Sequence, residues 1–213
     1  MDTVIEVPKI DRLNKLRSIC HKCCACRLSE TRSRVVFGEG NSDALIMLLG
    51  EGPGRDEDLS GRPFVGRSGQ LLRKMLWSIG LNPEGDCFIS NVVKCRPPAN
   101  RPPEKDEIDL CVRYFLKQIE IIQPSFLVLF GKTAVKGLFP DLGDMTMYDL
   151  RSKADLTFKG IKALVTYHPS ALLRDPKWHA GAKDDFKKIK EAYSEAAFYR
   201  KTLEGETCFE GVY

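Results

Sequence analysis

One glycine-rich stretch, residues 50–70, contains several side chains that could do chemistry. It follows an apolar run at 44–49 and precedes an apolar helical pattern at 71–77, so we expect it to connect a buried strand to a helix. Ligand sites in open α/β sheets favour such connections, and glycine allows the backbone to approach a ligand closely. The candidate functional side chains in this stretch are Glu51, Asp56, Glu57, Asp58 and Phe64.

Two further polar residues lie at the ends of apolar runs. Asn91 lies in the strand-like run 88–93, and His168 directly follows the run 161–167. A neutral imidazole can donate one hydrogen bond, and an asparagine amide can both donate and accept, so both could contact a polar ligand. The same residues could equally be a buried, hydrogen-bonded histidine and a turn asparagine. Their types and positions alone leave both alternatives open.

The chain has eight cysteines, which is many for a protein of 213 residues. A reducing compartment argues against structural disulfides, so we favour a metal site. The early C-x-x-C pairs are Cys20/Cys23 and Cys23/Cys26, and Cys95 and Cys111 would complete the site. The alternative is that Cys95 and Cys111 are buried free thiols. Zinc and an iron-sulfur cluster both accept four thiolates, and the spacing does not separate them.

Four short apolar runs alternate with helical patterns along the chain. We expect strands at 44–49, 88–93, 126–130 and 161–167, and helices at 103–123, 132–138 and 180–199, with residues 145–160 irregular or a hairpin. This alternation predicts an α/β fold with three αβα layers and a central, mainly parallel four-stranded sheet. In such a sheet Glu51, Asn91 and His168 all follow carboxyl ends of strands, so they would converge on one crevice.

The length fits a single domain over residues 1–213, with an N-terminal helical segment at 1–34 and a C-terminal tail at 200–213. The sequence has neither an apolar stretch long enough to cross a membrane nor the apolar centre of a signal peptide. We therefore expect a soluble, cytoplasmic protein that is a monomer. The formal charge of +4 indicates only mild attraction to an anionic partner.

Four motifs together resemble the family 4 uracil-DNA glycosylases, the iron-sulfur branch of that superfamily. In chain order they are CCACRLSETRSRVVFGEGN, GEGPGRDEDLSGRPFVGRSGQLL, ISNVVKCRPPANRPP and YHPSALLR, and they lie between Cys23 and Arg174. The resemblance implies an enzyme that flips uracil out of single- or double-stranded DNA. It would hydrolyse the bond between uracil and deoxyribose and leave an abasic site, which starts base excision repair.

The resemblance also implies a role for each site residue. Glu51 would orient the attacking water or stabilise the cationic sugar, and His168 would donate to uracil O2. Asn91 would pair with the base edge and Phe64 would stack on it, with Gly52 also lining the uracil site. The implied DNA contacts are Ser170, Arg174 and Arg101, together with Leu172 or its neighbour Leu173 as an apolar wedge.

In the best-known branch of the superfamily an aspartate stands where this chain has Gly52, and a tyrosine that excludes thymine stands at Gly54. The group that handles the water and the way thymine is refused are therefore not given by the motifs. The resemblance implies a [4Fe-4S] cluster, distant from the crevice, that pins the N-terminal segment to the core. Its ligands would be Cys23, Cys26, Cys95 and Cys111, with Cys87 and Cys208 as bystanders.

The alternative function is a non-catalytic iron-sulfur DNA-binding module that accompanies a polymerase or repair complex. A binding module would have no need of Glu51, Asn91 and His168 together, so the sequence favours the enzyme. A contact with a sliding clamp or a replisome has no recognisable signal in the sequence.

Overall fold

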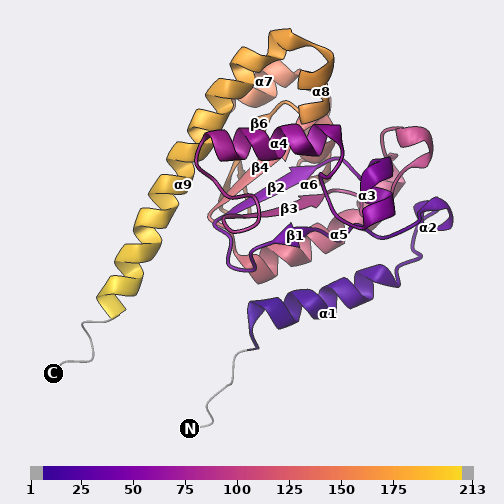
Figure 1. Cartoon of the computed structure of the whole chain (residues 1–213), viewed down its shortest axis with the longest axis horizontal. Helices are drawn as coiled ribbons and strands as arrows, with labels where there is room; N and C mark the ends of the chain where they lie inside the picture. Colours follow the sequence, from indigo (N-terminus) through magenta and orange to yellow (C-terminus); the bar gives the residue numbers. More distant parts are fainter. Residues whose placement is uncertain (1–6, 208–213) are drawn as a thin grey trace.

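The computed structural model describes residues 7–207 and has one central sheet covered by helices on both faces (Figure 1). The strand order is β1-β3-β2-β4-β6-β5. The strands are β1 (Glu39–Gly40), β2 (Ile46–Gly50), β3 (Cys87–Asn91), β4 (Phe126–Phe130), β5 (Thr157–Phe158) and β6 (Ile161–Thr166). The helices are α1 (Lys9–His21), α2 (Leu28–Thr31), α3 (Arg55–Ser60), α4 (Arg67–Ser78), α5 (Lys105–Ile122), α6 (Gly131–Leu138), α7 (Met147–Ser152), α8 (Pro169–Arg174) and α9 (His179–Thr207).

The four predicted strands form the parallel centre of the sheet, in the order β3, β2, β4 and β6. Every residue of β2, β3 and β4 is buried, which explains why these strands appear in the sequence as continuous apolar runs. Two short antiparallel edge strands, β1 and β5, add to this centre. The pairing of β5 with β6 is the hairpin alternative for residues 145–160, preceded there by α7.

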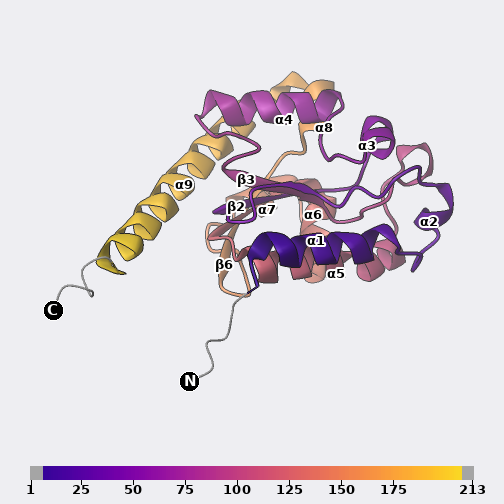
Figure 2. The same ribbon diagram turned by 60° about the horizontal axis from the view of Figure 1, so that its bottom comes forward.

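Alternate residues of the central strands pack on opposite faces of the sheet, as the two-residue period of a strand requires. Met47 and Leu49 belong to the cluster that includes α1, α5 and α6, whereas Ile46 and Leu48 belong to the cluster with α4 and α9. Figure 2 shows α4 and α8 on one side of the sheet and α1 and α5 on the other. The predicted three-layer αβα architecture is confirmed.

The last helix is longer than its sequence pattern predicts. The apolar spacing ends near Ala197, but α9 continues through Thr207, so the first residues of the expected tail at 200–213 are helical. Leu203 is 65% exposed, so the apolar period of the helix does not extend to it. Cys208 lies outside the described residues.

The N-terminal segment contains α1 and α2, and α1 packs along α5 (Figure 2). Lys9 Nζ donates to Ile122 O at 2.9 Å, and Arg27 bonds Glu107 at 2.8 Å, so both ends of this segment are tied to α5. Over residues 7–207, the helices are either too short or too polar to cross a membrane.

Candidate active site

A cavity of about 290 Å³ lies at the carboxyl ends of β2, β3 and β6. Its lining brings together the predicted residues Glu51, Gly52, Phe64, Asn91 and His168. Arg101, Ser170 and Arg174 also contribute to its wall. The three loops that the sequence places at one edge of the sheet therefore meet in one site.

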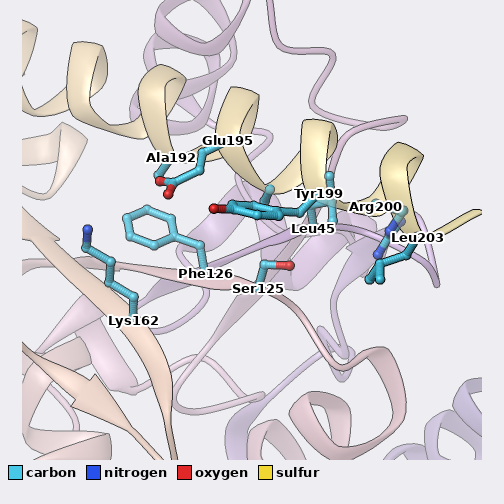
Figure 3. Close-up of a pocket in the computed structure, with 10 residues that line it drawn as sticks. Leu45, Ser125, Phe126, Lys162, Ala192, Glu195, Tyr199, Arg200 and Leu203 are labelled. Carbon is cyan, nitrogen blue, oxygen red and sulfur yellow. The ribbon is translucent and has the colours of Figure 1, made fainter. Parts of the chain in front are cut away.

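A larger cavity, about 420 Å³, lies at the opposite ends of the strands, beneath the second half of α9 (Figure 3). Leu45, Phe126 and Tyr199 give it a mainly apolar lining, and Lys162 and Glu195 lie toward one end. It contains none of the predicted site residues. The smaller cavity is therefore the candidate active site.

Asn91 is the last residue of β3 and is 2% exposed. Its Oδ1 is buried and, among residues 7–207, is the one buried side-chain nitrogen or oxygen without a hydrogen-bond partner. Leaving such an acceptor unpaired costs about 1–3 kcal/mol. Gly50 lies directly beside it, and a Cβ at Gly50 would overlap both Asn91 Oδ1 and the Phe64 ring. The cavity therefore presents an acceptor that needs a donor from a ligand.

His168 caps the first turn of α8, two residues after the end of β6. Its Nδ1 accepts from the Ser170 backbone N–H at 3.2 Å and lies 2.8 Å from Ser170 Oγ. Because Nδ1 is an acceptor there, the neutral ring carries its proton on Nε2. Burial, together with the smaller effect of the positive charge of Arg174, lowers the pKa of His168 to about 4. The imidazole is therefore a neutral Nε2–H donor at neutral pH.

Phe64 is 3% exposed and adopts a left-handed backbone conformation, with φ of 52°. Its ring centroid lies 5.9 Å from that of His168 and 6.2 Å from that of Phe130. A Cβ at Gly69, in the first turn of α4, would overlap the Phe64 backbone, so a glycine is needed for this approach. The aromatic ring thus forms one wall of the cavity, beside the imidazole.

Glu57 holds the loop that carries Phe64. Its carboxylate accepts from the backbone N–H groups of Gly54 at 3.1 Å, Val65 at 2.9 Å and Gly66 at 2.8 Å. These bonds join both ends of the glycine-rich loop. They offset the cost of the left-handed backbone conformation of Phe64, which is about 1 kcal/mol or more for a non-glycine residue. The sequence made Glu57 a candidate for chemistry, but its carboxylate is used to hold this loop.

Glu51 accepts a hydrogen bond from Thr133 Oγ1, with 2.5 Å between Oε2 and Oγ1. Thr133 lies in the first turn of α6, directly after β4, and was not among the sequence candidates. Its position after a parallel strand, at the same sheet edge as the other site residues, was the signal that could have identified it. Thr133 orients the Glu51 carboxylate within the cavity.

Two residues expected to contact DNA make contacts within the protein. Leu172 is 2% exposed and packs with Tyr167 and Ala182, whereas Leu173 is 44% exposed. Leu172 therefore cannot act as the wedge in this conformation, because α8 turns it towards α4 and α9. Arg101 is also engaged, since its guanidinium forms two bonds of 2.6 and 2.8 Å with Glu107.

Five cysteines line a third, small cavity beside α5. They are Cys20, Cys23, Cys26, Cys95 and Cys111, whereas Cys24 is exposed. Three N–H groups point at their sulfur atoms, from Arg32 to Cys95 at 3.2 Å, from the Lys94 backbone to Cys111 at 3.2 Å, and from Arg113 to Cys23 at 3.8 Å. Over residues 7–207, no three ligating side chains are close enough together to surround a single metal ion.

Comparison with known proteins adds independent information. The family model described as the uracil DNA glycosylase superfamily matches residues 37–196. A type-4 uracil-DNA glycosylase from Thermotoga maritima is 47% identical, over 72% of this chain and 79% of that protein. Proteins of the same name from Archaeoglobus fulgidus and Saccharolobus solfataricus are 43% and 42% identical, covering 79% and 87% of this chain and 87% and 88% of their own lengths. The residues matched by the family model include the whole lining of the 290 Å³ cavity.

Proposed function

Because the chain belongs to the uracil-DNA glycosylase superfamily, we propose that it flips uracil out of DNA and hydrolyses its bond to deoxyribose. The observation that carries this proposal is the unpaired Oδ1 of Asn91, buried in the wall of a cavity that also holds a carboxylate and a neutral imidazole. Uracil N3–H is a donor of the kind that this oxygen lacks. The product is an abasic site that enters base excision repair.

Breaking the glycosidic bond leaves positive charge on the sugar and negative charge on the departing base. The Nε2–H of His168 donates to uracil O2 as that oxygen becomes anionic, and Ser170 keeps the imidazole in the required tautomer. Glu51 stabilises the cationic sugar and orients the water that adds to it, and Thr133 fixes its carboxylate. Phe64 stacks on the extruded base, a contact worth about 1–3 kcal/mol.

Glu51 is the carboxylate available for this work, since the Glu57 side chain is bound by three loop N–H groups. Gly52 cannot easily be replaced by the aspartate of the best-known branch, because a Cβ there would lie 2.7 Å from Val93 Cγ2. Arg174 is exposed at the cavity and is the cation that we assign to a DNA phosphate, with Arg101 instead fastening the start of α5 through Glu107.

The assignment of uracil release is tested on oligonucleotides that contain one uracil, single-stranded or paired, followed by alkaline cleavage of abasic sites. Strand scission at the uracil is expected from both substrates, with none in a matched thymine oligonucleotide. Binding without scission at enzyme excess would overturn the enzyme assignment and favour a non-catalytic DNA-binding module. The cavity that Asn91 lines favours the enzyme, because a module that only binds DNA needs no cavity for a base.

We assign a [4Fe-4S] cluster to Cys23, Cys26, Cys95 and Cys111. The all-sulfur donor set and the N–H groups that point at it suit anionic sulfur atoms. A [4Fe-4S] cluster needs four thiolate ligands, and these four cysteines line the same small cavity. Its role is structural, because two ligands belong to the N-terminal segment and two to the core.

Replacing Cys111 with serine is expected to release the iron and lower the thermal midpoint, because one of four ligands is lost where the N-terminal segment joins the core. Cys24→Ser is the matched control, since Cys24 is exposed and does not line the cavity. Iron per chain, absorption near 400 nm and thermal unfolding are the measurements. Full iron content in the Cys111 variant would place Cys20, the fifth cysteine of the cavity, in the ligand set.

Substitutions of the two adjacent leucines of α8 are expected to have different effects, one on stability and the other on DNA binding. Leu172→Ala should lower the free energy of unfolding by about 2–5 kcal/mol, as for other buried leucines. Leu173→Ala should leave that free energy within about 0.5 kcal/mol of the original and weaken binding to duplex DNA. Urea denaturation and duplex affinity measure the two effects. If Leu172→Ala instead weakened duplex binding and Leu173→Ala instead lowered stability, Leu172 would be the wedge.

A further inference from the structure

Lys94 is a fully buried lysine between the cysteine cavity and the active-site cavity, with 1% of its surface exposed. Its Nζ donates to Ser90 Oγ at 2.5 Å, to the Asn91 backbone oxygen at 2.8 Å and to Gln118 Oε1 at 3.1 Å. These three acceptors satisfy the three protons of an ammonium group. The geometry therefore suits a charged lysine held in one position.

Within the described part of the chain, the positive charge of Lys94 has no carboxylate partner. None of the ion pairs formed between residues 7 and 207 includes Lys94. A buried charge without a counter-charge is strongly unfavourable, and the Phe115 ring, 5.6 Å from Nζ, offsets only part of this cost. A compensating negative charge must therefore come from other neighbours.

Cysteine sulfur atoms are the neighbours that can supply it. Lys94 lines the cysteine cavity, precedes Cys95 and donates its backbone N–H to Cys111 Sγ at 3.2 Å. Four thiolates that bind a [4Fe-4S] core give that site a net charge of about −2. The ammonium group is thus placed to balance a loaded cysteine site.

The same ammonium group holds the residue that contacts the base. Its bond to the Asn91 backbone oxygen fixes the end of β3, and Asn91 Oδ1 is the unpaired acceptor of the active site. Gln118 Nε2 and Ser90 Oγ both donate to Phe37 O, at 2.9 and 3.2 Å, so the acceptors around Lys94 are themselves fixed. A shift of Lys94 would move the backbone that positions the amide.

We propose that the Lys94 ammonium group is the counter-charge of the cysteine site and a positioning residue for Asn91. Through it, the state of the cysteine site controls how well the active-site cavity recognises uracil. This inference rests on the proposed function. It also gives the cluster an influence on activity although the cluster takes no part in the reaction.

Three variants test this inference. Lys94→Met removes the charge and the hydrogen bonds and keeps an apolar side chain of similar length. Lys94→Gln removes the charge and keeps an N–H group that can donate to the Asn91 backbone oxygen after a small shift. Lys162→Met, at an exposed lysine of β6, is the matched control for loss of one positive charge. Iron per chain, the reduction potential of the cluster and single-turnover release of uracil are measured for each.

Both Lys94 variants are expected to contain less iron and to have a more negative reduction potential, because a nearby positive charge favours the added electron. Lys94→Met should also release uracil about tenfold more slowly per loaded molecule, as expected when a hydrogen bond to a charged group is lost. Lys94→Gln should recover part of that rate without recovering the potential. The Lys162 variant should match the original protein in all three measurements.

Unchanged iron content and potential in both Lys94 variants would overturn the counter-charge role. A rate in loaded Lys94→Met equal to that of the original protein would overturn the positioning role. If Lys94→Met does not fold, the potential and rate of Lys94→Gln decide the two points. Failure of the original protein to release uracil would refute the proposed function instead, and the iron and potential measurements would still test the counter-charge.

Discussion

Replacing His168 with alanine is expected to lower the single-turnover rate of uracil release by about 10²- to 10³-fold, the usual effect of losing one donor to a developing oxyanion. Affinity for uracil-containing DNA should change little, because the hydrogen bond strengthens only as charge develops on the base. The geometry supports this, since Ser170 occupies Nδ1 and leaves Nε2–H as the donor on the cavity side. Single-turnover kinetics and DNA affinity, measured on the same preparations, separate the two effects.

Ser170→Ala is the control for orientation. It removes the hydroxyl group at 2.8 Å from Nδ1 but keeps the backbone N–H at 3.2 Å, so the tautomer should persist and the rate should fall far less than in the His168 variant. An unchanged single-turnover rate in His168→Ala would show that another group stabilises the departing base.

The pH dependence of stability and of uracil release follows from the burial of His168. The pKa of His168 is about 4 in the folded protein, below its ordinary value of 6.5, so the folded state binds fewer protons at this residue than the unfolded state does. Its contribution to stability is complete above about pH 6.5 and is lost as the pH falls towards 4. The rate of uracil release should therefore show no transition attributable to this imidazole between pH 6 and 9. A midpoint near 6.5 that disappears in His168→Ala would contradict the lowered pKa.

The sheet and the meeting of three loops could be predicted because both depend on local pattern. Continuous apolar runs identify buried parallel strands, and residues that follow parallel strands share one edge of the sheet. The short strands β1 and β5 have two residues each, too few to produce a period, and they became visible only through their pairing.

The different roles of similar neighbouring residues could not be predicted from the sequence. Asp56, Glu57 and Asp58 are consecutive acidic residues, and only the path of the loop shows that Glu57 turns back to its N–H groups. Leu172 and Leu173 differ only in which side of a short helix they occupy. Such choices depend on how one element docks against another, and sequence spacing carries no record of that docking.

Long-range polar contacts were equally hidden. Lys94 and Gln118 lie 24 positions apart, and Glu51 and Thr133 lie 82 apart, yet each pair is hydrogen bonded. Lysine in an apolar strand end would ordinarily be assigned to the surface. Its burial is intelligible only once the cysteine cavity is placed beside it.

Asn91→Asp is expected to reduce uracil release by about 10²-fold, because the amide N–H that would donate to uracil O4 is replaced by a second acceptor and a buried polar contact is lost. Cytosine presents a donor at its 4-position and an acceptor at N3, which mismatches both contacts of the original amide. The ratio of uracil to cytosine release should therefore fall in the aspartate variant. Single-turnover release from oligonucleotides that differ only in the target base measures this ratio.

Stability distinguishes this recognition role from a structural one. Asn91 Oδ1 is buried without a hydrogen-bond partner in the protein, so Asn91→Ala removes an unfavourable group together with some packing. The free energy of unfolding should then stay within about 1 kcal/mol of the original, while uracil release is largely lost. A loss of stability like that of a core leucine would mean that Asn91 serves the fold. A stable but inactive alanine variant would mean that the protein leaves this acceptor unpaired for the base that it binds.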